Sequence, residues 1–340
     1  MKLLVVVLNY RVTQLTIDCL RALSKEIASV PGAKVAICEN GTGDDSAERI
    51  QRAIEENGWG EWCDLTVIHP NRGFTGGNNV IIRAALAWAI PPEYFLLLNA
   101  DTIVQPRALS ELVKFMDENC KVGVAGSQLL SPEHVVQASP FRFQGIATEL
   151  DRGLRLGIVS KWLSRWAVVP PTPTSSCQAD WVSGASMIIR RQVIEAIGPL
   201  DEDYYTYFDD IDYCLNAKRA GWSTCYVPAS RVIHLEAAST GIAQKIVKRR
   251  PVYWFEARRR FFLKNYGAVY TALADLAFII GFALWRIRRA IQRKADDDPP
   301  HLLWDAVCQS VFLKGFRVRP VQNPALREQP MSHAAGMTQT

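Results

Sequence analysis

The sequence predicts an α/β fold: a doubly wound, mainly parallel sheet with helices on both faces, followed by a C-terminal helical appendage. Two observations predict the sheet. Short apolar runs alternate with amphipathic segments over roughly the first 125 positions, and each run ends in polar or glycine-rich sequence. A third observation predicts the appendage, because Lys, Arg and aromatic residues become crowded from residue 245 onward. A chain of 340 residues accommodates one large domain with an appendage, or two domains.

Five short runs rich in apolar residues are the expected strands, and the run at 94–98 is typical of a fully buried strand in a sheet covered on both faces. They cover residues 2–8, 34–38, 65–69, 94–98 and 121–125, and amphipathic helices are expected over about 13–25, 45–56, 79–89 and 106–118. Residues 127–177 carry loop signals at several prolines, so we expect a variable connection or flap there. Regular pattern returns at residues 181–190, 204–221 and 223–234.

The composition is that of a globular protein, with 49% hydrophobic and 21% charged residues. The net charge of +5 is mild, but residues 245–294 are crowded with Lys and Arg, which favours a negatively charged partner at that end. The eight cysteines form no CxxC pair and no zinc-type spacing. We therefore expect buried thiols in a reducing cytosol. The N-terminal run lacks the length and cleavage site of a signal peptide.

Polar residues follow the expected strands at the edge where open α/β sheets bind ligands. This pattern places Asn9, Glu39, Asn71 and Asp101 along one edge, where a nucleotide would lie. Asp101 directly follows the buried run 94–98, and a carboxylate there is unfavourable unless it is paired. A metal or a phosphate-bearing ligand is therefore expected beside Asp101, and capping of the next helix is the structural alternative.

The glycine-rich segment 73–79, GFTGGNN, does not match GxGxxG and follows the third strand, so a dinucleotide fold is not indicated. Its backbone can approach a ligand closely, and a tight strand-to-helix turn is the alternative interpretation.

Three carboxylates lie within four positions at Asp209, Asp210 and Asp212, where they repel one another. One of them can act as a general base while another orients a partner, and an acid-rich helix N-terminus is the alternative. His234 follows an expected strand, and a lone histidine is commonly structural. Near Asp101 it would offer an imidazole that suits Mn²⁺ and is tolerable for Mg²⁺.

Seven motifs, in order, resemble the family 2 glycosyltransferases, especially the bacterial rhamnosyltransferase-like branch. They are VVLNY at 6–10, CENG at 38–41, NRGFTGGNN at 71–79, LLNADTIV at 97–104, WVSGASMIIRR at 181–191, YFDDIDYCLNAKRAGW at 207–222 and VIH at 232–234. Each motif is weak alone, whereas seven in order are specific. The resemblance implies a GT-A type catalytic domain over residues 1–240 and inverting transfer of a sugar from a nucleotide-sugar donor.

The resemblance also implies roles for individual residues. Asp210 would be the catalytic base and Asp209 a supporting acid, while Asp101 and His234 would hold Mg²⁺ or Mn²⁺. Donor-binding positions would be Asn9, Tyr10, Glu39, Asn71, Gly76, Asn78, Asn99 and Asp101, and acceptor-side positions would be Trp181, Gly184 and Asp212. The sequence departs from the family pattern at Asn99 and Glu39, where Asp is usual, and at Asp209, where Glu is common.

Residues 241–296 form a basic, aromatic and helical segment that we expect at the interface of an anionic membrane surface. Residues 268–285 are almost uncharged, but Asp275 near their middle is unfavourable in lipid, so a spanning helix is the weaker alternative. Packing of the segment on the core is another alternative. No recognition motif supports binding to nucleic acid. Residues 297–340 are expected to form a largely irregular tail.

These features predict a cytoplasmic enzyme, peripheral on the inner face of the cell membrane. It would move a sugar, such as rhamnose or another deoxyhexose, to a hydroxyl of a cell-surface glycan or lipid-linked acceptor. One alternative is a sugar-phosphate nucleotidyltransferase, which usually needs a basic glycine-rich loop where this chain has Asn9 and Tyr10. Another is a non-catalytic, membrane-associated scaffold, against which the presence of Asp101, Asp210 and His234 argues.

Overall fold

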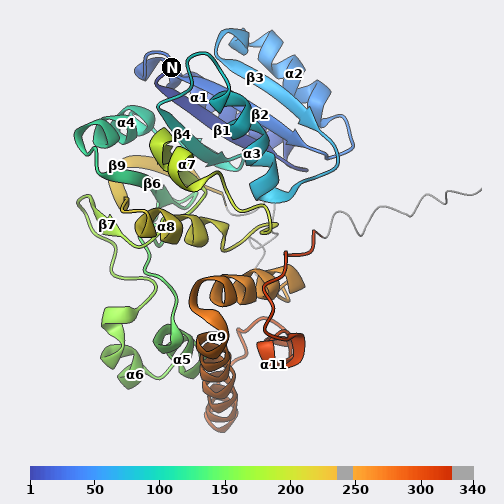
Figure 1. The fold of residues 1–340 in the computed structure, drawn as a ribbon, viewed down its shortest axis with the longest axis vertical. Coiled ribbons are helices and arrows are strands. Elements are labelled where there is room, and N and C mark those ends of the chain that lie inside the picture. Colours follow the sequence, from blue (N-terminus) through green and yellow to red (C-terminus); the bar gives the residue numbers. More distant parts are fainter. Residues whose placement is uncertain (236–247, 324–340) are drawn as a thin grey trace, which may run out of the picture.

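The structure is a computed structural model that describes residues 1–235 and 248–323. The predicted α/β fold is confirmed, with one sheet in the strand order β3-β2-β1-β4-β8-β6-β9-β5 and with β7 paired to β9 (Figure 1). The strands are β1 (Leu3–Asn9), β2 (Lys34–Asn40), β3 (Cys63–Ile68), β4 (Tyr94–Asn99), β5 (Thr102–Val104), β6 (Val122–Leu130), β7 (Cys177–Ala179), β8 (Ser186–Arg190) and β9 (Ser223–His234).

The helices of the domain lie between these strands, and further helices follow β9. They are α1 (Thr13–Ser24), α2 (Ser46–Glu56), α3 (Gly73–Leu86), α4 (Ala108–Glu118), α5 (Ile146–Leu154), α6 (Gly157–Trp162), α7 (Arg191–Ile197), α8 (Asp209–Arg219), α9 (Val252–Ile291), α10 (Leu302–Cys308) and α11 (Val311–Lys314). The segment 127–177, expected to be irregular, thus contains α5 and α6. Two short helices also form within the segment 297–340 that was expected to be a largely irregular tail.

The parallel part of the sheet sets the level of the strand ends. β1 pairs in parallel with β2 and β4, and β2 pairs in parallel with β3. In this register Asn9 lies opposite Glu39, and Leu8 lies opposite Asn99. β8 then joins β4 in the antiparallel direction, and β6 and β9 complete a mixed half. Polar residues that follow three different strands therefore meet at one edge, as the sequence predicts.

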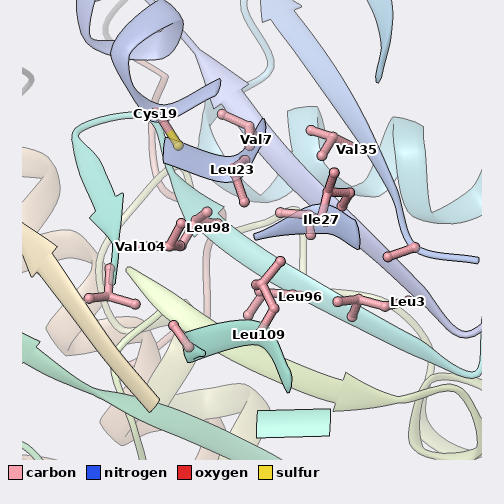
Figure 2. Close-up of a cluster of buried hydrophobic side chains, with 14 of the residues drawn as sticks. Leu3, Val7, Cys19, Leu23, Ile27, Val35, Leu96, Leu98, Val104 and Leu109 are labelled. Carbon is pink, nitrogen blue, oxygen red and sulfur yellow. The ribbon is translucent and has the colours of Figure 1, made fainter. Parts of the chain in front are cut away.

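Both faces of the sheet are covered by helices, which explains why the strands are continuously apolar. Leu3, Val5 and Val7 of β1 belong to a core with α1, α2 and α4 (Figure 2). Leu4 and Val6 point to the other face and pack with α3, α7 and α8. This alternation follows from the period of two in a strand.

The appendage is a packed helical layer centred on α9. Gly267, with φ of 80°, interrupts α9, and its two halves run in different directions (Figure 1). α5 crosses the second half where a Cβ on Gly153 would lie 2.8 Å from the carbonyl oxygen of Phe278. At the same crossing a Cβ on Gly281 would lie 3.0 Å from the backbone nitrogen of Leu154. The two glycines therefore permit the close approach of these helices.

The first half of α9 corrects one expectation about residues 241–296. Phe255, Phe261 and Phe262 are buried in protein cores, and Arg258 forms buried ion pairs with Glu149 of α5 and with Asp275. These four side chains are therefore occupied within the protein, and residues 241–247 of the expected segment lie outside the described residues. The alternative, packing on the core, holds for this half. Among the described helices, α9 is also the one long and apolar enough to cross a membrane by length and composition.

Candidate active site

Asn9 and Glu39 lie side by side at the ends of β1 and β2, and both are buried. The Glu39 carboxylate accepts hydrogen bonds from the backbone N–H groups of Thr42 (2.8 Å) and Gly41 (3.3 Å) and so shapes the turn after β2. The Asn9 side-chain oxygen accepts a hydrogen bond from Thr16, while its Nδ2 has no partner among the described residues. A buried donor without a partner is unfavourable unless a ligand or water satisfies it.

A pocket of about 560 Å³ opens beside these strand ends. It is lined by the residues that follow β1 and β2, namely Arg11, Val12, Thr13, Gln14, Leu15, Thr42, Asp44 and Arg49. The guanidinium of Arg11 lies over the ring of half-buried Tyr10, at 5.1 Å from its centroid. Two arginines in this lining make the pocket attractive to an anionic ligand.

Asn71 is fixed by Asn40, a residue that the sequence interpretation missed. The Asn40 side chain donates to the Asn71 side-chain oxygen (3.3 Å) and to the Gly73 carbonyl (2.9 Å). It also accepts from the backbone N–H of Arg72 (2.9 Å), so one amide holds the whole turn after β3. The available signal was its place directly after Glu39. From the other end of the chain, the Asn323 side chain donates to the Asn71 carbonyl (2.8 Å).

Helix α3 begins at Gly73, six residues earlier than expected, and takes in the glycine-rich segment. The reason is local packing: Gly73 has φ of 73°, and Phe74 donates its backbone N–H to the Tyr205 carbonyl (2.7 Å). Gly76 packs on the Arg72 side chain, and the Asn78 side chain donates to the Phe74 carbonyl within the helix (2.8 Å). This segment therefore ties the turn after β3 to the chain that precedes α8. The positive φ of Gly73 suits the turn, whereas a Cβ on Gly77 would clash with the Leu8 side chain of β1.

Asp101 and His234 come together although they are far apart in sequence. β5 pairs with β9 so that Thr102 lies opposite His234, and His234 Nε2 lies 3.4 Å from Asp101 Oδ1. The Asn99 side-chain nitrogen lies 3.4 Å from the same imidazole nitrogen. The sequence separation of Asp101 and His234 did not by itself predict that they would be in contact. Residues 1–235 and 248–323 contain no group of three or more His, Cys, Asp or Glu side chains that could hold a metal alone.

One carboxylate and one imidazole nevertheless fit a divalent cation that takes its remaining ligands from a substrate. Mg²⁺ in nucleotide sites is usually held by one or two carboxylates together with phosphate oxygens and water. Mn²⁺ accepts an imidazole beside oxygen ligands. Buried Asp101 is the carboxylate at this position, and His234 is the imidazole. Asn99 contributes an amide in place of a second acid.

Asp209 and Asp210 form the first turn of α8. Asp210 accepts hydrogen bonds from the backbone N–H groups of Ile211 (2.9 Å) and Gly184 (3.2 Å). Burial raises the pKa of Asp210 to about 6, although these backbone N–H groups lower it. Burial also raises the pKa of Asp209 well above its usual value, and the neighbouring Asp210 charge adds to that shift. The two carboxyls are neighbours, so they titrate as a pair.

Residues 184 and 185 link Asp209 and Asp210 to the strand end that carries Asn99 and Asp101. The Ala185 carbonyl accepts from the backbone N–H of Asn99 (3.0 Å), while the preceding N–H, of Gly184, donates to Asp210. A Cβ on Gly184 would lie 3.5 Å from the Phe74 ring and 3.8 Å from Asp210 Cβ, so this peptide lies between α3 and α8. The strand end at Asn99 and the carboxylate of Asp210 are thus held on one short segment of backbone.

Two of the expected acceptor-side residues are occupied elsewhere. Trp181 stacks on Phe141 with ring centroids 4.1 Å apart, and its indole N–H donates to the Arg142 carbonyl (3.0 Å). Asp212 is buried and points to the appendage, where Lys264 (2.6 Å) and Asn265 (2.7 Å) of α9 contact its two oxygens. The structure therefore does not bring Asp212 to the site. Its face of α8 is turned toward α9.

Part of the chain is similar in sequence to curated proteins that are named rhamnosyltransferases. N-acetylglucosaminyl-diphospho-decaprenol L-rhamnosyltransferase of Mycobacterium tuberculosis is 39% identical over 157 residues, which are 44% of this chain and 49% of that protein. Rhamnosyltransferase WbbL of Escherichia coli K12 is 24% identical over 164 residues, which are 48% of this chain and 60% of that protein. The chain thus spans about half the length of the curated relatives it matches.

Solved structures share the fold at low sequence identity. Mannosyltransferase PcManGT from Pyrobaculum calidifontis, in complex with GDP-Man and Mn²⁺, aligns over 93% of this chain and 82% of its own, with a TM-score of 0.56 and 14% identity. GalNAc-T7 with UDP, GalNAc and Mn²⁺ aligns over 87% of this chain and 55% of its own, with a TM-score of 0.58 and 13% identity. These likenesses confirm the expected GT-A type of fold.

The sequence model described as "Glycosyltransferase like family 2" matches residues 2–253, which include the strand ends, the Asp101–His234 pair and the acidic pair of α8. The chain therefore belongs to glycosyltransferase family 2.

Proposed function

We propose that this glycosyltransferase is metal-dependent and inverting, and that it transfers a sugar from a nucleotide donor to an acceptor hydroxyl. The observation that carries the proposal is the position of Asp210. Its carboxyl has a pKa raised to about 6 by burial and is held, through Gly184 and Ala185, beside the strand end that presents Asp101. A base beside a cation-binding edge is the arrangement that this reaction needs.

The donor end of the proposed site is the edge formed by Asn9, Tyr10, Glu39 and Asn71. The unpartnered Nδ2 of Asn9 offers a hydrogen bond to a ligand, and the pocket beside Tyr10 carries Arg11 and Arg49. We propose rhamnose or another deoxyhexose as the sugar, because two curated relatives are named rhamnosyltransferases.

Asp101 and His234 are the residues that would hold Mg²⁺ or Mn²⁺. A divalent cation supplies charge stabilisation for the diphosphate oxygens of the leaving group. Asn99, beside His234, fixes the imidazole through its side-chain amide. Replacing Asp101 by Ala should weaken Mn²⁺-dependent donor binding by about tenfold or more, which isothermal titration with and without Mn²⁺ measures. Donor affinity that is equal in both proteins would contradict the role of Asp101.

Asp210 accepts the proton of the acceptor hydroxyl in the proposed reaction. The hydroxyl oxygen then forms a bond to the anomeric carbon, and the bond from that carbon to the diphosphate breaks with its electron pair on the phosphate oxygen. Attack by the acceptor oxygen on the face opposite the leaving group inverts the anomeric centre in one step, so one base suffices and no covalent intermediate forms. Burial raises the pKa of Asp209, and a protonated Asp209 would limit the negative charge next to that base.

The acceptor that we propose is a cell-surface glycan or a lipid-linked sugar at the inner face of the cell membrane. The name of the Mycobacterium tuberculosis relative places the acceptor of that protein on diphospho-decaprenol, which supports the lipid-linked choice. The protein would then be cytoplasmic and peripheral, since its acceptor lies in the membrane while its donor is soluble.

Product analysis tests the proposed function. The purified chain is incubated with uridine, guanosine and thymidine diphospho-sugars and Mn²⁺ or Mg²⁺, and the released nucleotides are separated by chromatography. Release of a nucleoside diphosphate from one donor, lost in Asp210→Asn and retained in Asp212→Asn, is the expected result. Formation of pyrophosphate from a sugar phosphate and a nucleoside triphosphate would favour a nucleotidyltransferase. No turnover and no donor-dependent thermal shift would favour a scaffold.

A further inference from the structure

The second half of α9 exposes an apolar stripe. Every exposed residue of α9 from residue 268 to residue 291 is apolar. The large ones are 40% to 77% exposed and are spaced by three or four positions, namely Val269, Leu273, Leu276, Ile280, Leu284, Ile287 and Ile291. Residues at this spacing lie on one side of a helix. We call these seven residues the α9 stripe.

The opposite side of the same half-helix is covered by protein. Phe278 and Phe282 are buried in a cluster with Leu302 and Ala306 of α10, and Gly281 meets Gly153 of α5. The α9 stripe lies outside the core clusters of residues 1–235 and 248–323. A continuous apolar surface of this length is a feature of binding sites rather than of free surfaces.

The charge of the surrounding helices indicates what kind of surface the α9 stripe meets. In residues 145–170 and 268–323 the exposed acidic residues are Asp296 and Asp297. Exposed basic residues outnumber them and include Lys161, Arg165, Arg293, Lys294, Lys314 and Arg317. α6, the second half of α9 and α11 lie at one end of the molecule, away from the sheet (Figure 1). A second copy of the chain would bring like charges together there, whereas anionic lipid headgroups complement them.

The packing also decides how the helix meets a bilayer. Asp275 is buried in an ion pair with Arg258, and Arg288 donates to the carbonyls of Leu154 and Arg155 at the end of α5. A helix that spanned the bilayer would lose these contacts, because α5 and α10 run along one of its sides. Lying in the membrane surface keeps the contacts and inserts only the stripe. At 1.5 Å per residue the stripe is roughly 35 Å long.

We propose that the α9 stripe is the surface on which the protein docks to an anionic bilayer, with α9 parallel to the membrane plane. The proposal deepens the proposed function, on which it rests only for the location of the acceptor. It assigns the contact to residues 268–291 and excludes Phe255, Phe261 and Phe262 of the first half of α9, which are buried. Docking on this side would leave the donor edge in contact with the cytosol.

Flotation with vesicles tests the proposal. The full chain is mixed with vesicles of phosphatidylcholine alone, or of phosphatidylcholine and phosphatidylglycerol in equal amounts, and the floated fraction is measured. The stripe variant is Ile280→Glu with Ile287→Glu, and the matched control is Ile90→Glu with Val135→Glu, two exposed apolar residues elsewhere. We expect the wild type and the control to float with the anionic vesicles, and the stripe variant to partition at least tenfold more weakly.

Two further measurements keep the result interpretable. Circular dichroism melts check that both variants fold, and light scattering without lipid measures the oligomeric state. A folded stripe variant that floats like the wild type would overturn the proposal, as would equal flotation with neutral vesicles. A wild-type dimer that the stripe variant converts to a monomer would assign the stripe to a second copy instead. Nucleoside diphosphate release in the same preparations separates the two proposals, because turnover without flotation contradicts only this one.

Discussion

Two faces of helix α8 carry the same side chain in opposite surroundings. Asp210 faces Gly184, and within residues 1–235 and 248–323 its hydrogen-bond donors are the neutral backbone N–H groups of Gly184 and Ile211. Asp212, two residues later, accepts from Tyr204 (3.3 Å), Asn216 (3.0 Å), Asn265 (2.7 Å) and the Lys264 ammonium (2.6 Å). One charge is therefore left uncompensated at the site, and the other is neutralised at the contact with α9.

The difference shows that the role of a carboxylate is set by its tertiary neighbours and not by the motif that contains it. A buried charge without a counter-ion is destabilising, and such groups occur where their reactivity is used. A buried charge with several donors instead fixes two elements against each other. The two residues before Asp209 are also fixed by contacts with α9. Tyr207 stacks on Tyr253 and Phe208 contacts Trp254, and these contacts hold the positive φ angles of 68° and 62°.

Asp210→Asn should produce the largest effect on activity. It removes the base while keeping the shape of the side chain, so kcat should fall by roughly 10²–10⁴-fold. Removal of an uncompensated buried charge should leave the melting temperature at pH 7 unchanged or higher. Initial-rate kinetics and differential scanning fluorimetry measure the two quantities. Activity close to that of the wild type would exclude Asp210 as the base.

Asp212→Ala should produce the largest effect on stability. It tests whether Asp212 has a structural role, in contrast to the catalytic role proposed for Asp210. It removes three neutral hydrogen bonds and one ion pair from a buried position. We expect a loss of about 3 kcal/mol in the free energy of unfolding. This loss is at the low end of what is usual for breaking a buried ion pair. The reason is that Lys264 is partly exposed and keeps Asp201 as a second partner.

Urea unfolding measures this loss, and initial rates per folded molecule provide the control. Rates within a few-fold of the wild type are expected, because Asp212 lies on the α9 side of the helix. An unchanged unfolding free energy together with a large loss of rate would return Asp212 to the active site.

The pH dependence of the rate should show that Asp210, and not Asp212, is the carboxylate that must be ionised for activity. Asp210 acts only when ionised, and burial raises its pKa to about 6 from a usual 3.8. The rate should therefore fall about tenfold per pH unit below 6 and level off above it. The same shift means that the folded protein binds this proton more tightly than the unfolded chain does. The contribution of Asp210 to stability consequently decreases as pH rises from about 3.8 to about 6.

The measurement is a profile of kcat/KM between pH 4.5 and 8, in which Asp212→Ala should keep the midpoint near 6. A midpoint near the ordinary value of 3.8 would show that the Asp210 carboxyl is solvated in the working enzyme.

The sequence predicted the parallel strands because each is a local run rich in apolar residues, and it predicted that Asn9 and Glu39 lie together at the strand ends. Asn71 is joined to the same edge by its hydrogen bond with Asn40 of β2. The motif order indicated the acidic pair of α8. The features that the sequence did not predict depend on contacts between segments that are distant in the chain. Asp212 was assigned to the acceptor side because its α9 partners lie about fifty positions later, and Asn40 acts through a turn on another strand.

The early start of α3 and the burial of the first half of α9 have the same cause. Helix α3 begins at Gly73, where Phe74 donates a hydrogen bond to Tyr205, and Phe261 is buried against Phe208, which precedes α8, and Ile211 of α8. Composition alone did not distinguish a basic, aromatic segment that binds a membrane from one that packs on a domain. The distinction required the facing helix.

Lys264→Met should have the smallest effect on stability. It shows whether the Lys264 charge or the neutral hydrogen-bond donors stabilise the Asp212 carboxylate. Met keeps the length of the side chain, and three donors to Asp212 remain. Because Lys264 is partly exposed, a loss of about 1 kcal/mol in unfolding free energy is expected, with no change in kcat. Lys264→Arg should restore the stability. A double-mutant cycle with Asp212→Asn isolates the pair: coupling near zero would mean that the neutral donors alone hold Asp212, whereas coupling near the full loss would assign the contact to charge.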